Sequence, residues 1–196
     1  MVAETHYRCL YKNFLNTPHL FDLMIEPESN TLEEFRLRCL EKENDKSRVY
    51  FVASKVDEPG EYIGLCCIAC VDQKNRKMEL GRGFFSHLLQ RTMASTELFF
   101  LVIRYSFELG YLRVFMRTSP KNTASMHMMS RLGFSLEGTF RSDFILDGYA
   151  IDCVTYSILE YEWPTAKKAM EEWLLPENFD SQGKQKKPLQ IIYEHK

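Results

Sequence analysis

The sequence predicts an α/β protein in which helices cover the faces of one mixed β-sheet. Two strand-like runs, the first of them rich in valine, tyrosine and phenylalanine, flank a turn in the first half of the chain. A helix that is apolar nearly all round lies between two later strands, and a hairpin dipeptide joins the last two. The chain has 196 residues, of which 45% are apolar and 27% charged, so it is long enough for one good-sized core.

The first third of the chain is helical in character. Apolar residues recur at helical spacing from Tyr7 to Leu15, and Asn16-Thr17-Pro18 ends that pattern. A second helix is expected to begin at Asn30 or Thr31, either of which can cap it, and to run to about Lys42. Two glutamates in its first turn favour this start, because the N-terminal end of a helix dipole is positive.

Three strands and a β-α-β unit are expected next. Residues 47–54 and 61–71 form a hairpin through Asp57-Glu58-Pro59-Gly60. The third strand has Glu79, Gly81 and Gly83 on one face, and such glycines indicate either a bulge or a surface that another group approaches closely. The ranges are Lys77–Phe85 for this strand, Met93–Leu109 for a central helix that packs on both sides and ends at Gly110, and Leu112–Arg117 for a parallel strand.

The last third is expected to contain two helices and a hairpin. They are a short helix from Asn122 to Leu132-Gly133, strands over 134–145 and 149–159 joined by Asp147-Gly148, and a helix from Pro164 to about Leu175. The inner stripe of the short helix is expected to comprise Ala124, Ser125, Met128, Met129 and Leu132. Residues 181–196 are expected to be a solvated extension.

Charge and cysteine usage restrict the function classes. The net charge of −2 provides no general attraction to nucleic acid. The lysines of residues 181–196 support a nucleic-acid partner only weakly. No apolar run could cross a membrane and no signal core begins the chain, so we expect a cytoplasmic protein with no nucleic-acid or membrane partner. Cys67 and Cys70 have C-x-x-C spacing but lack a second pair, so we expect them and Cys66 to be buried reduced thiols, with no metal.

The second half of the chain contains an ordered set of short motifs. They are Asn122-Thr-Ala-Ser125, Leu132-Gly-Phe134, Glu137-Gly138, Arg141, Gly148, Asp152 and Glu162-Trp-Pro164. At this spacing the set resembles the GNAT superfamily of N-acetyltransferases, in particular the ribosomal-protein-alanine (RimJ/RimL-type) branch, and the resemblance extends from about Tyr7 to Leu175. It implies a single domain over residues 1–176, an extension over 177–196, and a largely antiparallel twisted sheet whose two central strands splay apart.

The resemblance also implies where acetyl-CoA binds. Gln90-Arg-Thr-Met-Ala-Ser95 is similar to the family's pyrophosphate loop Q-x-x-G-x-G/A, although Met93 and Ser95 replace small residues. Met93 would obstruct the loop if its φ had to be positive. Backbone N–H groups at the following helix start would hold the diphosphate. The expected cofactor-binding residues are Gln90, Arg91, Thr92, Met93, Ala94, Ser95, Thr96 and Asn122.

For catalysis, the resemblance implies a tyrosine acid in the helix after Asn122, but Met129 stands at that position. Ser125 is the expected substitute, and a first-turn serine that only bonds the helix backbone is the alternative. Asn122 orients CoA, caps its helix, or does both. Glu79 is ranked first as the general base, acting through water.

Four further polar residues are weaker candidates. Asp143 lies one position from an acidic residue of the branch, and one position in a strand means the opposite face. Arg141 and Asp152 are expected to pair within the sheet or to line the amine site. His87 is expected to be solvated.

By this resemblance the family's first strand is expected to be missing, because Tyr7 corresponds to a position within the family's first helix. The exposed edge could cause homodimerisation, be covered by residues 190–193, or lower activity. The expected function is acetyl transfer from acetyl-CoA to a primary amine, of a protein N-terminus or a small molecule, by direct attack, because no cysteine lies beside the cleft motif. The alternative is a catalytically weakened acyl-CoA-binding or interaction protein on the same scaffold.

Overall fold

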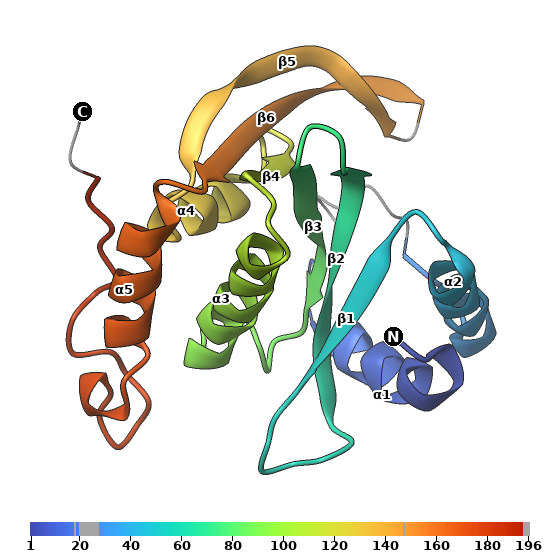
Figure 1. Ribbon diagram of the computed structural model, residues 1–196. Coiled ribbons are helices and arrows are strands. Elements are labelled where there is room, and N and C mark those ends of the chain that lie inside the picture. Colours follow the sequence, from blue (N-terminus) through green and yellow to red (C-terminus); the bar gives the residue numbers. More distant parts are fainter. Residues whose placement is uncertain (18, 20–27, 147, 194–196) are drawn as a thin grey trace. The chain divides into compact units, whose positions relative to one another are not determined.

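A computed structural model describes residues 1–17, 19, 28–146 and 148–193. The expected elements are present in the expected order (Figure 1). They are α1 (Ala3–Leu15), α2 (Leu32–Asn44), β1 (Val49–Ser54), β2 (Tyr62–Asp72), β3 (Lys77–Phe85), α3 (Met93–Glu108), β4 (Arg113–Thr118), α4 (Thr123–Arg131), β5 (Ser135–Leu146), β6 (Tyr149–Leu159), α5 (Trp163–Trp173) and a 3₁₀ helix η1 (Pro176–Asn178). Residue 147 of the predicted hairpin turn lies outside the described residues.

The described strands form one six-stranded sheet in the order β1-β2-β3-β4-β6-β5. Antiparallel pairing joins β1 to β2, β4 to β6 and β5 to β6, whereas β3 and β4 are parallel. Parallel pairing covers only Lys77–Glu79 with Arg113–Phe115, although both strands continue further, as expected of a splayed pair. In the described sheet, β1 is therefore one of the two edge strands.

The chain folds into two compact units, which share β3 and α3. The first unit comprises Met1–Val71 and Leu80–Ser95, and the second Asp72–Glu79 and Thr96–Lys196. In the first unit, α1 and α2 bury Phe14 and Phe35 with Cys67 of β2 in one apolar cluster. Of the two predicted caps, Thr31 caps α2 by accepting a hydrogen bond from the Glu34 N–H (3.1 Å).

The core of the second unit comes from α3, α4 and α5 together with one face of β4 and β6. Trp163 stacks on Phe107 of α3 with ring centroids 5.3 Å apart. The expectation that α3 packs on both sides is wrong in part, because Leu101 and Tyr105 are 42% and 44% exposed. On α4, Met129 and Leu132 are buried, but Ala124 is exposed and does not belong to the inner stripe.

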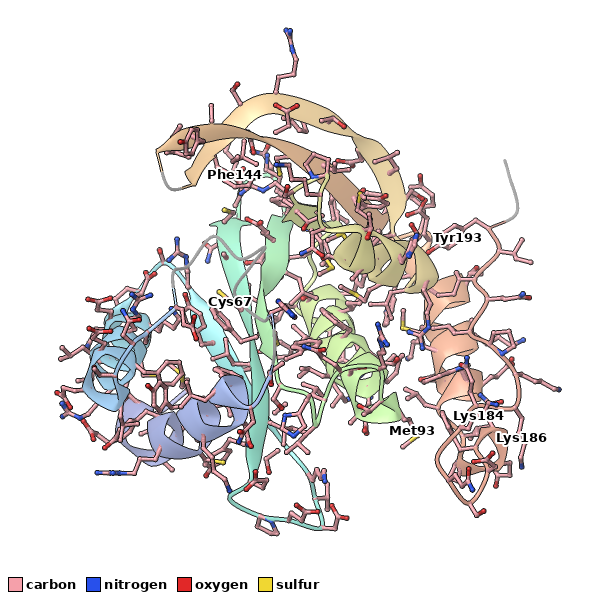
Figure 2. The ribbon with its side chains drawn as sticks, turned by 180° about the vertical axis from the view of Figure 1, so that it is seen from behind. Cys67, Met93, Phe144, Lys184, Lys186 and Tyr193 are labelled. Carbon is pink, nitrogen blue, oxygen red and sulfur yellow. The ribbon has the colours of Figure 1, made fainter. Side chains whose placement is uncertain are left out.

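The C-terminal segment is exposed over residues 181–188, as expected of a solvated extension, but Leu189 and Tyr193 pack against the rest of the second unit. Leu189 is buried, and the Tyr193 hydroxyl donates to the Gly133 carbonyl (2.6 Å) between α4 and β5 (Figure 2). Gly133 permits this contact because a Cβ there would stand 2.5 Å from the tyrosine oxygen. Residues 190–193 therefore form no strand, and Tyr193 bonds at this junction.

The cysteines are free thiols. Cys66 and Cys67 are buried in β2, as predicted, and burial raises the pKa of the Cys66 thiol to about 12. Cys70 is exposed instead, at a left-handed φ of 47° near the end of β2. In the described residues, no group of three or more His, Cys, Asp or Glu side chains is arranged to hold a metal ion, and no helix has the length and apolarity that crossing a membrane requires.

Candidate active site

The loop before α3 is shaped by its own polar side chains. Gln90 donates through Nε2 to the Phe85 carbonyl (2.7 Å), which ties the loop to the end of β3. Thr92 Oγ1 donates to the Leu89 carbonyl (2.7 Å) and lies 3.3 Å from the Ser95 N–H. Thr92 therefore caps α3, a role for which threonine is well suited. The predicted cofactor residues Gln90, Thr92 and Ser95 thus fix the loop with their side chains.

The left-handed position in this loop is Arg91, with φ of 60°. Met93 begins α3 two residues later and has no positive φ, so the predicted obstruction does not arise (Figure 2). A left-handed conformation costs a residue with a Cβ about 1–2 kcal/mol. Arg91 is also exposed, so this position combines a strained backbone with a side chain that is accessible to solvent.

The first turn of α3 is suited to an anion. Its N–H groups have no acceptor within the helix, and the dipole makes this end positive. The first turns of α1 and α2 contain Glu4, Glu33 and Glu34, whereas that of α3 contains no acidic residue. The segment therefore fits a diphosphate, which the N–H groups of Met93 and Ala94 and the charge of Arg91 would bind.

Thr96 has a different environment from the loop. Its side chain is buried, and its Oγ1 accepts from Nη1 (3.1 Å) and Nη2 (3.0 Å) of Arg131. The Arg131 guanidinium also lies over the Trp173 ring (4.8 Å to the centroid), and burial lowers the pKa of Arg131. The Thr96 hydroxyl is therefore engaged within the second unit. Sequence reasoning missed Arg131, because no local pattern links it to Thr96.

The start of α4 contains the two other predicted residues. Asn122 caps the helix, since its side chain accepts from the Ser125 N–H (3.1 Å). The Ser125 hydroxyl is half-buried and has no hydrogen-bond partner among the described residues. Met129, at the position of the family's tyrosine, is 1% exposed and lies in the core. Ser125 is therefore a possible proton or hydrogen-bond donor here, and Met129 is not.

Glu79, Arg117 and Asp143 form an ion-pair network in the second unit, which we call the Arg117 cluster. Arg117 donates through Nε to Glu79 Oε1 (3.2 Å) and through Nη2 to Glu79 Oε2 (2.8 Å). Its Nη1 donates to Asp143 Oδ2 (3.1 Å). The Glu79 side chain is 11% exposed, against 27% for Asp143. Both oxygens of the predicted base thus accept hydrogen bonds from a guanidinium.

A bulge brings Asp143 into this cluster. Phe140 and Phe144 pair with Cys153 and Ile151, so three residues of β5 lie opposite one residue of β6. Ser142 has φ of 52° within it. Extra residues break the alternation of faces. The prediction that Asp143 faces the other side of the strand is therefore wrong.

The bulge also decides the partner of Asp152. Asp152 Oδ1 accepts the Ser142 N–H (2.9 Å). The expected pair of Asp152 with Arg141 is not found in the described part of the chain. His87 is exposed, as expected, and its N–H donates to Thr17 Oγ1 (2.9 Å).

Cys153 is buried beside the Arg117 cluster, contrary to the expectation that no cysteine lies near the site. Burial is the largest cause that raises the pKa of its thiol, to about 11, and the carboxylates of Asp143 and Glu79 add to the effect of burial. A thiol with this pKa is protonated at neutral pH and is a poor nucleophile. The cysteine therefore does not favour a covalent enzyme intermediate.

The mixed sheet, in which α3 connects the parallel strands β3 and β4, defines a protein of the α/β class. Residues 2–135 match the acetyltransferase (GNAT) domain model. This chain belongs to the GNAT acetyltransferase family, in which acetyl-CoA is the acyl donor. Membership of the RimJ/RimL-type branch stays a prediction.

Several known proteins are similar to this chain. The N-acetyltransferase p20 of Bacillus licheniformis is 30% identical over 118 residues, and the match spans 61% of that relative's length. A GCN5-related N-acetyltransferase from Brucella melitensis superposes with a TM-score of 0.91 at 31% identity, over 95% of this chain and 86% of that one. A GNAT-family protein from Chromobacterium violaceum gives 0.79 at 26% identity, over 84% and 82%.

Proposed function

We propose that this protein transfers the acetyl group of acetyl-CoA to a primary amine, of a protein N-terminus or of a small molecule. The observation that carries the proposal is the family match over residues 2–135, which includes both the loop before α3 and the whole of α4. The relative named above is matched over 61% of its length, so activity and substrate are proposals for this chain.

The donor would bind through the loop before α3. The N–H groups at the start of α3 and the guanidinium of Arg91 supply the positive partners for the diphosphate. Gln90 and Thr92 fix the loop from the side, through their bonds to Phe85 and Leu89. Pre-formed donors cost little reorganisation on binding, which favours affinity.

The chemistry is direct attack. The lone pair of the amine forms the new C–N bond at the thioester carbonyl, and the C–S bond breaks as the tetrahedral intermediate collapses. The Ser125 hydroxyl would donate a hydrogen bond to the leaving thiolate, with Asn122 holding it at the helix start. The amine nitrogen loses a proton as the amide forms, and Glu79 is the proposed base that takes this proton through a water molecule. The two hydrogen bonds from Arg117 to Glu79 compete with that role.

A second candidate is an acyl-CoA-binding or interaction protein with weakened catalysis. The specific observation that favours it is Met129, which fills the position of the family's tyrosine and is buried. If Ser125 supplies no proton or hydrogen bond, the thiolate leaves without assistance. The two candidates therefore predict equal binding of acetyl-CoA and different rates of thiol release.

The decisive experiment measures thermal stabilisation by acetyl-CoA and then release of free thiol over a panel of primary amines. Stabilisation with release supports the enzyme, and stabilisation without release on every amine supports the second candidate. Ser125→Ala should lower kcat about a hundredfold with unchanged acetyl-CoA affinity. Ser130→Ala, an exposed serine on the same helix, is the matched control. Equal kcat in both variants would exclude Ser125 as the donor.

Compartment and partners are also proposals. The free thiols support a reducing, cytoplasmic location. A homodimer through the edge strand β1 is a second proposal, because unpaired backbone groups at an edge favour association. Cell fractionation and light scattering after size exclusion test the two, and we expect no nucleic acid or membrane in the complex.

A further inference from the structure

One face of β4, β6 and β5 in the second unit carries charged and polar side chains. The Arg117 cluster holds two carboxylates against one guanidinium, which leaves one net negative charge. The adjacent pair of Arg113 with Glu137 is neutral and is completed by the Ser157 hydroxyl, which donates to Glu137 Oε1 (2.6 Å). The excess charge on this face therefore belongs to Glu79 and Asp143.

Thr155 is an independent sign of a ligand on this face. Thr155 is 3% exposed, and its side-chain Oγ1 is buried without a hydrogen-bond partner among the described residues. In register it lies between Arg117 of β4 and Gly138 of β5, and residues directly opposite across strands share a face. A Cβ at Gly138 would have no atom within 4 Å, so space is open beside it. A buried hydroxyl without a partner is costly until a bound group supplies one.

Phe140 adds an aromatic surface. It pairs with Cys153, two residues before Thr155 on β6, and therefore lies on the same face. Its side chain is large, apolar and 54% exposed. A ring next to carboxylates favours an alkyl chain that ends in a cation, because the ring face attracts positive charge.

We propose that the Arg117 cluster, with Thr155 and Phe140, binds the amine acceptor and selects amines that carry a second cationic group over amines that carry a carboxylate. The proposal rests on the acetyltransferase function proposed above. A carboxylate offers about four acceptor sites, more than Arg117 uses on Asp143, so a second cation can be accepted there. An anionic acceptor meets the net negative charge and is repelled.

Three four-carbon amines that differ only at the far end test the selectivity. They are 1,4-diaminobutane, 4-aminobutyrate and n-butylamine, and the readout is kcat/KM from thiol release. We expect the diamine to exceed the aminobutyrate by about a hundredfold, with n-butylamine between them. Equal values for the three amines would overturn the proposal while leaving the proposed function intact.

Two variants with matched controls assign the effect to residues. Asp143→Asn removes the net charge while Glu79 keeps its pair with Arg117, and it should reduce the diamine preference about tenfold. Glu108→Gln, an exposed carboxylate on α3, should leave it unchanged. Thr155→Val should raise KM for the diamine several-fold, and Thr139→Val on the opposite face of β5 should not. A diamine preference that survives Asp143→Asn refutes the role of Asp143. If Thr155→Val only raises the Tm, the hydroxyl has no role in binding.

Binding separates failure of this inference from failure of the proposed function. If no amine releases thiol, titration calorimetry with 1,4-diaminobutane on the CoA-saturated protein decides. Heat that is lost in Asp143→Asn and restored in Asp143→Glu supports a cation site without catalysis. Absence of heat with the unmodified protein overturns the site. Melting curves of each variant confirm that it is folded.

Discussion

The substitution Arg91→Gly separates the effect of Arg91 on the stability of the protein from its proposed effect on CoA binding. The left-handed φ of 60° costs arginine about 1–2 kcal/mol, and glycine is free of that cost. Glycine loses about 0.5–1 kcal/mol more backbone entropy on folding. The difference predicts that the free energy of unfolding rises by about 0.5–1 kcal/mol in the variant.

The same substitution removes the exposed positive charge beside the proposed diphosphate. A hydrogen bond to a charged group contributes about 1.5–3 kcal/mol. Arg91 is exposed and its charge is screened by solvent, so the lower end applies. We therefore expect the Kd for CoA to rise about tenfold, with a weaker salt dependence than in the unmodified protein. Stability and affinity change in opposite directions, which a general loss of structure cannot produce.

Urea unfolding and calorimetric titration with CoA at two salt concentrations measure the two quantities. Arg91→Asn is the comparison, because asparagine tolerates the left-handed region but carries no charge. Arg91→Lys keeps the charge and should keep most of the affinity. Unchanged CoA affinity in both uncharged variants would refute the role of Arg91 in phosphate binding. A lower unfolding free energy for Arg91→Gly would refute the strain argument.

Three further predictions concern stability. Gly133→Ala combines φ of 86° with a Cβ 2.5 Å from the Tyr193 oxygen, so urea unfolding should show a loss of about 2–3 kcal/mol, against about 1 kcal/mol for Tyr193→Phe; equal losses would contradict this. The pKa of Cys153 is raised from 9.0 to about 11, so its contribution to stability is present below pH 9 and is lost towards pH 11; Cys153→Val should flatten the urea midpoint over that range. Arg113 holds the pKa of Glu137 below 4.5, so its contribution is present above that pH and lost in acid; an unchanged acid transition in Glu137→Gln would oppose this.

The element order was predictable because its signals are local. Asn122 predicted the start of α4, and the structure shows the bond to the Ser125 N–H that makes it a cap. Gly110 and Gly148 both have positive φ, as a helix end and a hairpin turn require. Each of these signals depends on residues within a few positions of one another, so one sequence is enough to find them.

The candidate site was predictable only where its residues lie close together in the sequence. The loop before α3 was found by its similarity to a family loop, but its left-handed position is Arg91, not Met93. The contacts of Arg117 with Glu79 and Asp143 span 38 and 26 positions, and that of Arg131 with Thr96 spans 35. Strand order and helix packing bring such residues together, and neither leaves a periodic pattern around the residues themselves.

Asp143 shows why a residue's chemistry and its position must be established separately. Its carboxylate made it a candidate, but the alternation of faces along a regular strand then predicted that its side chain lies on the face away from the site. That argument assumes regular pairing, and the bulge between Phe140 and Phe144 removes the assumption by adding residues to one strand. The added residues bring a carboxylate to Arg117, which Glu79 alone would neutralise completely. The irregularity therefore creates the net charge on this face, and the proposed substrate selectivity depends on the residues that form the bulge.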